Sequence, residues 1–189
     1  MMSDRNRHWT VEETHADSVA NFLNVSRETR EKLEIYVDLL TKWQARINLI
    51  SSKTLPEIWH RHILDSAQLV LHLPRKPSVI LDMGSGAGLP GVILAIVTDH
   101  QLHLAESDSR KVSFMRTALR ETGTQAVLHE MRIEQLPVIQ PDIITARALA
   151  PLNQLMALCK AQHHEKLEYL FLKGRDAKQE LTALASCPK

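Results

Sequence analysis

The feature of this sequence that most limits its fold is a glycine-rich stretch behind a short apolar run. It reads Leu81-Asp82-Met83-Gly84-Ser85-Gly86-Ala87-Gly88-Leu89-Pro90-Gly91. The apolar residues before it have the composition of a buried strand, and those from Pro90 onward begin an apolar helix. Glycines at alternate positions remove the Cβ atoms where the backbone must turn, so a ligand can approach closely. The pattern predicts a strand–loop–helix unit that binds a nucleotide-like ligand, although a purely structural glycine turn would give the same letters.

Short apolar runs and helical stretches alternate after this loop. Strand-length runs lie near residues 79–83, 102–105, 126–129, 142–146 and 167–172, and helical patterns occur at 92–97, 112–119 and 152–160. Alternating β and α elements with buried strands indicate an α/β class with a doubly wound, mainly parallel sheet. We therefore predict a Rossmann-like core over residues 75–189.

The first 74 residues lack this alternation and predict a helical cap. Apolar residues at helical spacing indicate a helix over 26–47, with Ser26 as its N-cap. Thr54 and Glu57 have the spacing of a capping box and Pro56 suits a first helical turn, so a second helix is expected to run to about residue 73. The first eight residues are polar or charged and are expected to fray. The boundary between cap (1–74) and core (75–189) is placed at the Pro-rich linker 74–77.

Composition excludes several classes of protein. The chain has 189 residues, a formal net charge of +1 and 44% hydrophobic residues, which fits a globular protein and not a polycation. Its two cysteines, Cys159 and Cys187, suggest no disulfide framework. No signal peptide or membrane-length apolar run is visible, so we expect a cytoplasmic protein that needs no membrane. The histidine pairs at 60/62 and 163/164 lack metal-ligand spacing, and we expect no metal.

Two cofactors compete for the glycine loop. Gly86-x-Gly88-x-x-Gly91 also fits the dinucleotide fingerprint, and Glu106 lies where a carboxylate can accept the ribose hydroxyls of an adenosine. Asp82 would repel a pyrophosphate but suits the ammonium and sulfonium groups of S-adenosylmethionine. This charge argument favours S-adenosylmethionine over NAD(P).

At this point the sequence resembles a known family, the glucose-inhibited division protein B family of bacterial small-subunit ribosomal RNA methyltransferases. Besides the glycine loop, matching motifs follow in order from Trp43 to Gly174. They are Trp43-x-x-x-Ile47-Asn48-Leu49-Ile50, Arg61-His62-Ile63-Leu64-Asp65-Ser66, Glu106-Ser107, Arg132-Ile133-Glu134, Arg147-Ala148 and Lys173-Gly174. The family typically continues into a final pair of strands, whereas this sequence stops at Lys189, which would leave the run at 167–172 at a sheet edge.

The resemblance implies methylation of guanine N7 in 16S ribosomal RNA, free or in the small ribosomal subunit, by a protein expected to be monomeric. S-adenosylmethionine would be the donor and S-adenosylhomocysteine the product. Gly84 and Leu89 would line the cofactor site, Ile133 and Glu134 would flank the adenine, and Arg147 would stand at the mouth. With the residues argued above, the expected cofactor contacts are Asp82, Gly84, Gly86, Gly88, Leu89, Glu106, Ile133, Glu134 and Arg147.

Four basic residues are candidates for positioning the substrate: Arg61, His62, Arg147 and Lys173. Guanine N7 carries a lone pair and no proton, so its methylation needs orientation and no general base. Each candidate also has a structural interpretation. Arg147 would be an ion-pair partner, and Lys173 would extend to water from a strand end. Arg61 would pair with Asp65 four residues along a helix surface, and His62 would be a packed histidine.

One further helix is basic. Residues 109–120 contain four cations and no acid before Glu121, a pattern that fits either phosphate binding or a solvated face: Arg110, Lys111, Arg116 and Arg120. Two other functions stay open at this point. One is an NAD(P)-dependent oxidoreductase on the same fold, and the other is a non-catalytic RNA-binding assembly factor.

Overall fold

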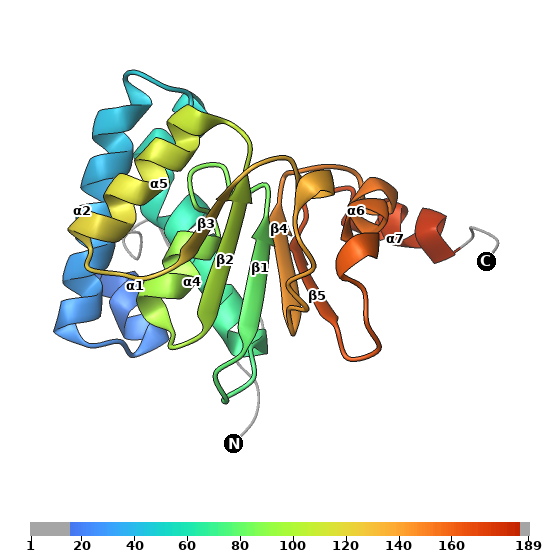
Figure 1. Ribbon diagram of the computed structural model, residues 1–189. Helices are drawn as coiled ribbons and strands as arrows, with labels where there is room; N and C mark the ends of the chain where they lie inside the picture. Colours follow the sequence, from blue (N-terminus) through green and yellow to red (C-terminus); the bar gives the residue numbers. More distant parts are fainter. Residues whose placement is uncertain (1–15, 186–189) are drawn as a thin grey trace.

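The computed structural model describes residues 16–185 and contains a five-stranded parallel sheet (Figure 1). The strand order is β3-β2-β1-β4-β5, with every neighbouring pair parallel. The strands are β1 (Val79–Met83), β2 (Gln101–Glu106), β3 (Val127–Glu130), β4 (Ile143–Arg147) and β5 (Glu168–Leu172). The order reverses between β1 and β4, the place where ligands collect in such sheets. The predicted fold class is thereby confirmed, and β5 lies at an edge of the sheet.

Helices cover both faces of the sheet. On one side lie α4 (Gly91–Val97) and α5 (Ser109–Glu121), and on the other α6 (Leu152–Cys159) and α7 (Ala177–Ala185) (Figure 1). Short 3-10 turns, η5 (Ile133–Gln135) and η6 (Lys160–Gln162), connect the remaining elements. Alternate residues of one strand enter opposite apolar clusters: Ile80 packs toward α4 and α5, and Leu81 toward α6.

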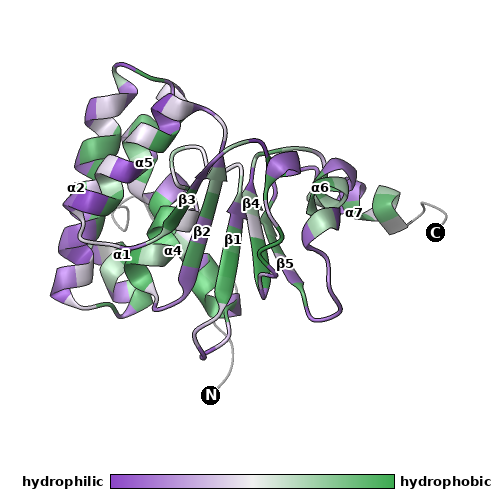
Figure 2. Ribbon diagram, in the orientation of Figure 1, coloured by the Kyte–Doolittle hydropathy of each residue, from purple (hydrophilic) through white to green (hydrophobic). Residues whose placement is uncertain are grey.

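The N-terminal helices form an outer layer on α4 and α5. They are α1 (Ala16–Leu23) and α2 (Arg27–Gln44), and α2 contacts both α4 and α5. Ser26 caps α2 by accepting the backbone N–H of Thr29 at 3.1 Å, which confirms the predicted N-cap. Apolar residues occupy the inner side of this helix, and polar residues its outer side (Figure 2).

The second cap helix was predicted wrongly as one α-helix with a capping box. The chain instead forms η2 (Ser52–Glu57, 3-10), η3 (Trp59–Leu64, π), α3 (Asp65–Ala67) and η4 (Gln68–His72, 3-10). Thr54 Oγ1 does not cap a helix but donates to the carbonyl of Ser51 at 2.8 Å. The Arg61 carbonyl accepts a guanidinium N–H from Arg147 at 2.7 Å. Tertiary bonds of this kind compete with a regular helical ladder.

One apolar cluster crosses the boundary predicted near residue 75. It joins Leu33 and Leu40 of α2 to Phe114 of α5 and to Ile80 of the central strand. The division into cap and core stays a prediction, and this cluster contains buried residues from both sides of it. Within residues 16–185 no helix has the length and apolar character needed to cross a bilayer.

Candidate functional site

The glycine loop connects β1 to α4 at the carboxyl ends of the strands. Gly84, Gly86 and Gly88 all have positive φ, at 67°, 56° and 80°, a region that glycine adopts without steric cost. The N–H of Ser85 donates to the Ala105 carbonyl of β2 at 3.0 Å, which ties the loop to the neighbouring strand. A Cβ added at Gly86 would meet nothing closer than the Gly84 carbonyl oxygen at 3.8 Å. The backbone is therefore open to a ligand at Gly86.

Glu106 ends β2 directly beside this opening. Its Oε2 accepts the N–H of Gly86 at 2.9 Å, and its Oε1 accepts the N–H groups of Ser107 and Asp108, both at 2.8 Å. The side chain is partly exposed. A carboxylate thus lies at the predicted position, held by backbone donors, and its contact with a ribose stays a prediction.

Asp82 lies on the opposite, inner side of the loop. Its side chain is fully buried, with Oδ2 accepting the Gly91 N–H at 3.2 Å and Oδ1 accepting the Thr145 hydroxyl at 2.8 Å. Burial raises the pKa of Asp82 to about 6, although these hydrogen bonds oppose the shift. The carboxylate anchors the first residue of α4, and a direct contact with a ligand would require the loop to open.

The other expected cofactor residues differ in their burial and in the space around them. A Cβ at Gly84 would lie 2.5 Å from Leu149 Cδ1, so Leu149, which sequence reasoning did not identify, closes over Gly84. A Cβ at Gly88 would collide with Val92, and the Leu89 side chain is buried in the core. Ile133 and Glu134 lie in η5, which follows β3; Ile133 is half-buried and Glu134 exposed. Their contact with an adenine stays a prediction.

Tyr36 is a second residue that sequence reasoning missed. It lies on α2 with no exposed surface, and its hydroxyl donates to the Ala87 carbonyl of the glycine loop at 2.6 Å. The helical pattern at 26–47 was identified without Tyr36, and no local signal indicates that its hydroxyl reaches a loop 51 residues away.

A cavity of about 500 Å³ lies beside the carboxyl ends of β4 and β5. The four candidate substrate-positioning residues all line it: Arg61, His62, Arg147 and Lys173. Residues from η2, η3 and α3 form one wall, and the turn before α7 forms another. The structure therefore brings together residues that are up to 112 positions apart in sequence, from 61 to 173.

Arg147 joins the end of β4 to the cap. Its Nε lies 3.2 Å from Asp65 Oδ2, and its terminal N–H donates to the Arg61 carbonyl. The pairing of Arg61 with Asp65 considered from sequence is wrong, because Arg61 lies 3.7 Å from Glu57 instead. Asp65, at the start of α3, therefore faces the end of β4 and not Arg61.

His62 lies in the same wall of the cavity, with only 7% of its surface exposed. Its Nε2 lies 2.8 Å from Thr54 Oγ1. Because that hydroxyl donates to Ser51, the imidazole donates from Nε2 and keeps a lone pair on Nδ1, which has no hydrogen-bond partner. Burial, together with the nearby Arg147 and Arg61, lowers the pKa of His62 to about 4. The ring is neutral at physiological pH.

Lys173 is held by protein groups at the other wall. Its Nζ donates to the Ala150 carbonyl at 2.8 Å and pairs with Glu180 of α7 at 2.7 Å. Glu180 also accepts the N–H of Leu152, the first residue of α6. Lys173 therefore connects β5, α6 and α7, and any contact with a substrate would have to compete with Glu180.

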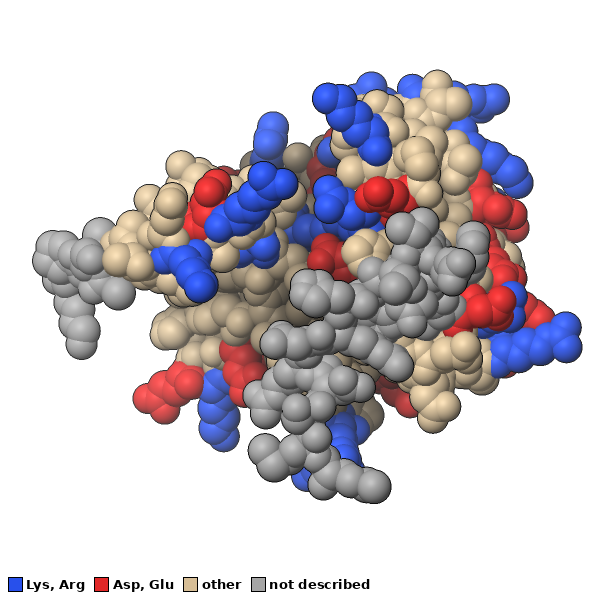
Figure 3. Space-filling view, turned by 180° about the vertical axis from the view of Figure 1, so that it is seen from behind, with Lys and Arg blue, Asp and Glu red and all other residues tan. Residues whose placement is uncertain are grey.

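The basic helix α5 carries less free charge than its sequence indicates. Arg110 pairs with Asp108 at 2.9 Å, Arg116 with Glu130 at 3.5 Å and Arg120 with Glu121 at 2.8 Å. These arginines are well exposed, so the pairs are weak. Figure 3 shows Lys and Arg gathered along the upper edge of the molecule, where the strands end, with Asp and Glu among them.

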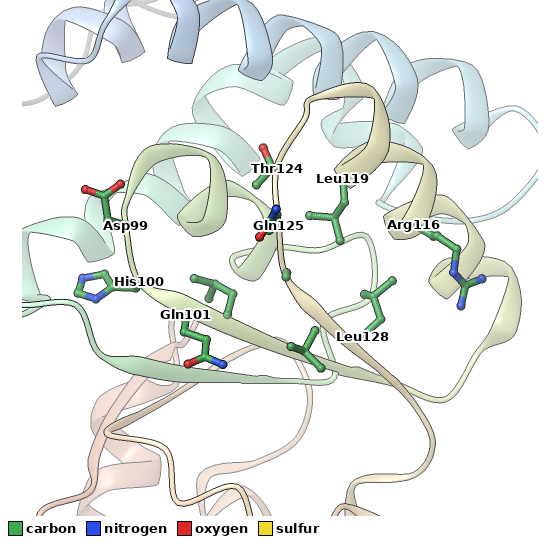
Figure 4. A pocket seen from close by; sticks show the side chains of 11 residues that line it. Asp99, His100, Gln101, Arg116, Leu119, Thr124, Gln125 and Leu128 are labelled. Carbon is green, nitrogen blue, oxygen red and sulfur yellow. The ribbon is translucent and has the colours of Figure 1, made fainter.

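A second hollow, of about 710 Å³, lies beside the amino ends of β2 and β3, away from the glycine loop. Its polar side chains, such as Asp99, His100 and Arg116, point in different directions (Figure 4). Within residues 16–185 there is no group of three His, Cys, Asp or Glu side chains that could hold a metal ion. Cys159 is a buried free thiol, and Cys187 lies outside the described residues.

Comparison with known proteins places the chain among methyltransferases. A family model described as "rRNA small subunit methyltransferase G" matches residues 29–187. The chain is 50% identical over 161 residues to "Ribosomal RNA small subunit methyltransferase G" of Paramagnetospirillum magneticum, covering 85% of this chain and 78% of that protein. It is 48% identical to the protein of the same name from Rhodospirillum rubrum, covering 86% and 81%.

Solved structures agree on the fold. The ribosomal protein L11 methylase from Lactobacillus delbrueckii subsp. bulgaricus superposes with a TM-score of 0.57 at 16% identity, over 67% of each chain. The C-terminal domain of precorrin-6Y C5,15-methyltransferase from Rhodobacter capsulatus gives 0.51 at 14% identity, over 64% of this chain and 68% of that one.

Proposed function

Because the chain belongs to the rRNA small subunit methyltransferase G family, we propose that it transfers a methyl group from S-adenosylmethionine to N7 of a guanine in 16S ribosomal RNA. One observation supports the site most directly: the loop is open at Gly86, next to Glu106 and on the same sheet edge as the cavity beside β4 and β5. The expected compartment is the cytoplasm.

The loop suits S-adenosylmethionine better than a dinucleotide. A pyrophosphate needs free backbone N–H groups at the loop. Here the Gly86 N–H is taken by Glu106, and the N–H groups of Gly88 and Leu89 donate to the Ser85 carbonyl at 2.7 and 3.1 Å. A phosphate would also face the Glu106 carboxylate. A ribose with two hydroxyl donors, attached to a cationic sulfonium, meets the same carboxylate favourably.

The reaction we propose requires positioning more than acid–base chemistry. Bound S-adenosylmethionine supplies an electrophilic methyl group, and guanine N7 already has a free lone pair. The residues of the cavity would hold the base in line with that methyl group. Because no proton has to be removed from N7, His62, whose ring is neutral, would contribute by contact and not as a base. Arg147 would donate to guanine O6 or to a neighbouring phosphate, leaving N7 free.

Two measurements test this function. We expect S-adenosylhomocysteine, and not NAD, to raise the thermal unfolding temperature, because ligand binding stabilises the folded state. Labelled S-adenosylmethionine should then label 16S RNA, and digestion should release 7-methylguanosine. Deproteinised RNA and assembled small subunits are compared as substrates.

Each contrary result has a distinct meaning. Stabilisation by NAD alone would point to an oxidoreductase. RNA binding without methyl transfer would point to a non-catalytic assembly factor. Label recovered at another atom would contradict the proposed N7 target while leaving the class of enzyme intact.

A further inference from the structure

Tyr36 gives the N-terminal cap a direct connection to the cofactor loop. We propose that Tyr36 is a positioning residue for cofactor binding, holding the glycine loop in its ligand-ready shape through the Ala87 carbonyl. This inference rests on the proposed use of S-adenosylmethionine. It assigns part of the cofactor site to α2, which lies in sequence far from every glycine of the loop.

The bond fixes one peptide unit at both ends. The Ala87 carbonyl accepts the Tyr36 hydroxyl at 2.6 Å, and the N–H of the same peptide, on Gly88, donates to the Ser85 carbonyl at 2.7 Å. This unit joins Ala87 to Gly88, and Gly88 has positive φ. Glycine crosses between backbone regions at little steric cost, so a peptide that ends on a glycine turns easily unless both of its polar groups are held.

The phenol itself is rigidly supported. The Tyr36 ring packs edge to face on Phe114 of α5, with centroids 5.9 Å apart, and neither side chain has exposed surface. Ala87 is also buried, with 3% of its surface exposed. If the hydroxyl were lost, water could not reach the Ala87 carbonyl without rearrangement. An unsatisfied buried carbonyl favours any conformation that lets it rotate toward solvent.

Ligand affinity should depend on this bond. If only a fraction of molecules keeps the loop in the binding shape, the apparent Kd rises by the inverse of that fraction. A weaker hold by Tyr36 thus lowers affinity without any direct contact between Tyr36 and the ligand. A purely structural role would instead lower stability and leave the Kd of the folded protein unchanged.

The chain offers a matched control, because its only other tyrosine is Tyr169. Tyr169 also uses its hydroxyl, which lies 3.0 Å from His163 Nδ1 on an exposed surface. Tyr36→Phe and Tyr169→Phe therefore remove the same atom. We expect Tyr36→Phe to weaken S-adenosylhomocysteine binding by about tenfold in calorimetry, the size expected for one buried carbonyl left without a donor. Tyr169→Phe should bind like the wild type.

Two further readouts separate positioning from stability. Amide hydrogen exchange of residues 86–89 should accelerate in ligand-free Tyr36→Phe, at a temperature where both proteins are folded. Tyr36→p-aminophenylalanine restores a donor in the same place and should recover most of the affinity. Equal Kd values for wild type and Tyr36→Phe, or no recovery with the amine, would overturn the inference. A wild-type protein that does not bind S-adenosylhomocysteine would instead contradict the proposed function.

Discussion

Two carboxylates hold the glycine loop from opposite sides, and their surroundings give them different tasks. Asp82 is fully buried and bonds Gly91 and Thr145, so it fixes where α4 begins. Glu106 is partly exposed and bonds Gly86, so it can exchange a backbone donor for a ligand hydroxyl. The charge argument from sequence treated Asp82 as ligand-facing. Burial makes Glu106 the better candidate for direct contact.

The open space at Gly86 leads to a prediction about ligand access. Gly86→Val should abolish binding of S-adenosylhomocysteine, because the branched side chain would occupy the approach path. Gly123→Val is the matched control: Gly123 also has positive φ, at 60°, and no atom within 4 Å of an added Cβ. Both variants should lose stability by about 1–2 kcal/mol from backbone strain. Calorimetric titration should separate them, and binding by Gly86→Val would refute the placement of the ligand.

Asp82 leads to a prediction about pH. Its pKa is raised from 3.8 to about 6, so between these values the native carboxyl holds a proton that the unfolded one has lost. The free energy of unfolding should therefore fall as pH rises through this window and level off above it. The free energy of unfolding lost through the titration of Asp82 is up to about 3 kcal/mol, because each pKa unit corresponds to about 1.36 kcal/mol.

Asp82→Asn should remove this dependence, since Asn can accept from Gly91 and donate to Thr145 without titrating. His62 acts in the opposite direction, because its lowered pKa costs stability as pH falls from 6.5 toward 4. The informative quantity is therefore the difference between the two proteins in urea unfolding from pH 4 to 7. Parallel curves would show that Asp82 titrates normally.

At the scale of elements, the irregular segment from η2 to η4 shapes the cavity more than a straight helix would. Its 3-10 and π turns present the Arg61 carbonyl and Asp65 to Arg147, and bring His62 against Thr54. On the far wall, α7 supplies Glu180 to Lys173. Both interior cations are thus fixed in place by neighbouring elements, which suits a site that orients its substrate.

The helix α5 carries a prediction about RNA. Replacing Arg110, Lys111 and Arg116 together with glutamine should weaken RNA binding and flatten its dependence on salt, since fewer counterions are released. The change should be smaller than for three free cations, because Arg110 and Arg116 already pair with carboxylates. Filter binding at several salt concentrations measures the slope, and unchanged S-adenosylhomocysteine affinity is the control. An unaltered slope would mean that α5 is only a solvated surface.

Across the whole molecule, features that depend on neighbouring residues could be predicted from the sequence, whereas contacts between residues far apart in sequence could not. The strands, the glycine loop and the Ser26 cap follow from periodicity and turn chemistry, which are encoded by neighbouring residues. The break in the second cap helix, the Tyr36 bond and the pairing of Asp65 with Arg147 depend on residues far apart in sequence. The sequence placed Arg61 among the candidates through family resemblance and Lys173 through its position after a strand, and the structure shows that they share one cavity.

The continuous apolar core predicts that cap and sheet unfold together. The tryptophans of the described residues, Trp43 and Trp59, both precede residue 75, so in a Trp9→Phe background their fluorescence reports on the cap. Cys159 reports on the far face of the sheet, where it is buried beside Met83 with the sulfur atoms 3.8 Å apart. In a Cys187→Ser background, urea should expose Cys159 to a thiol reagent at the concentration where fluorescence changes, as two-state unfolding requires.

The core cluster and the Tyr36 and Arg147 bonds all cross residue 75, so loss of either side exposes the apolar surface of the other. A fluorescence transition at clearly lower urea would show instead that the cap detaches first, and the cofactor loop would then lose Tyr36 while the sheet stays folded.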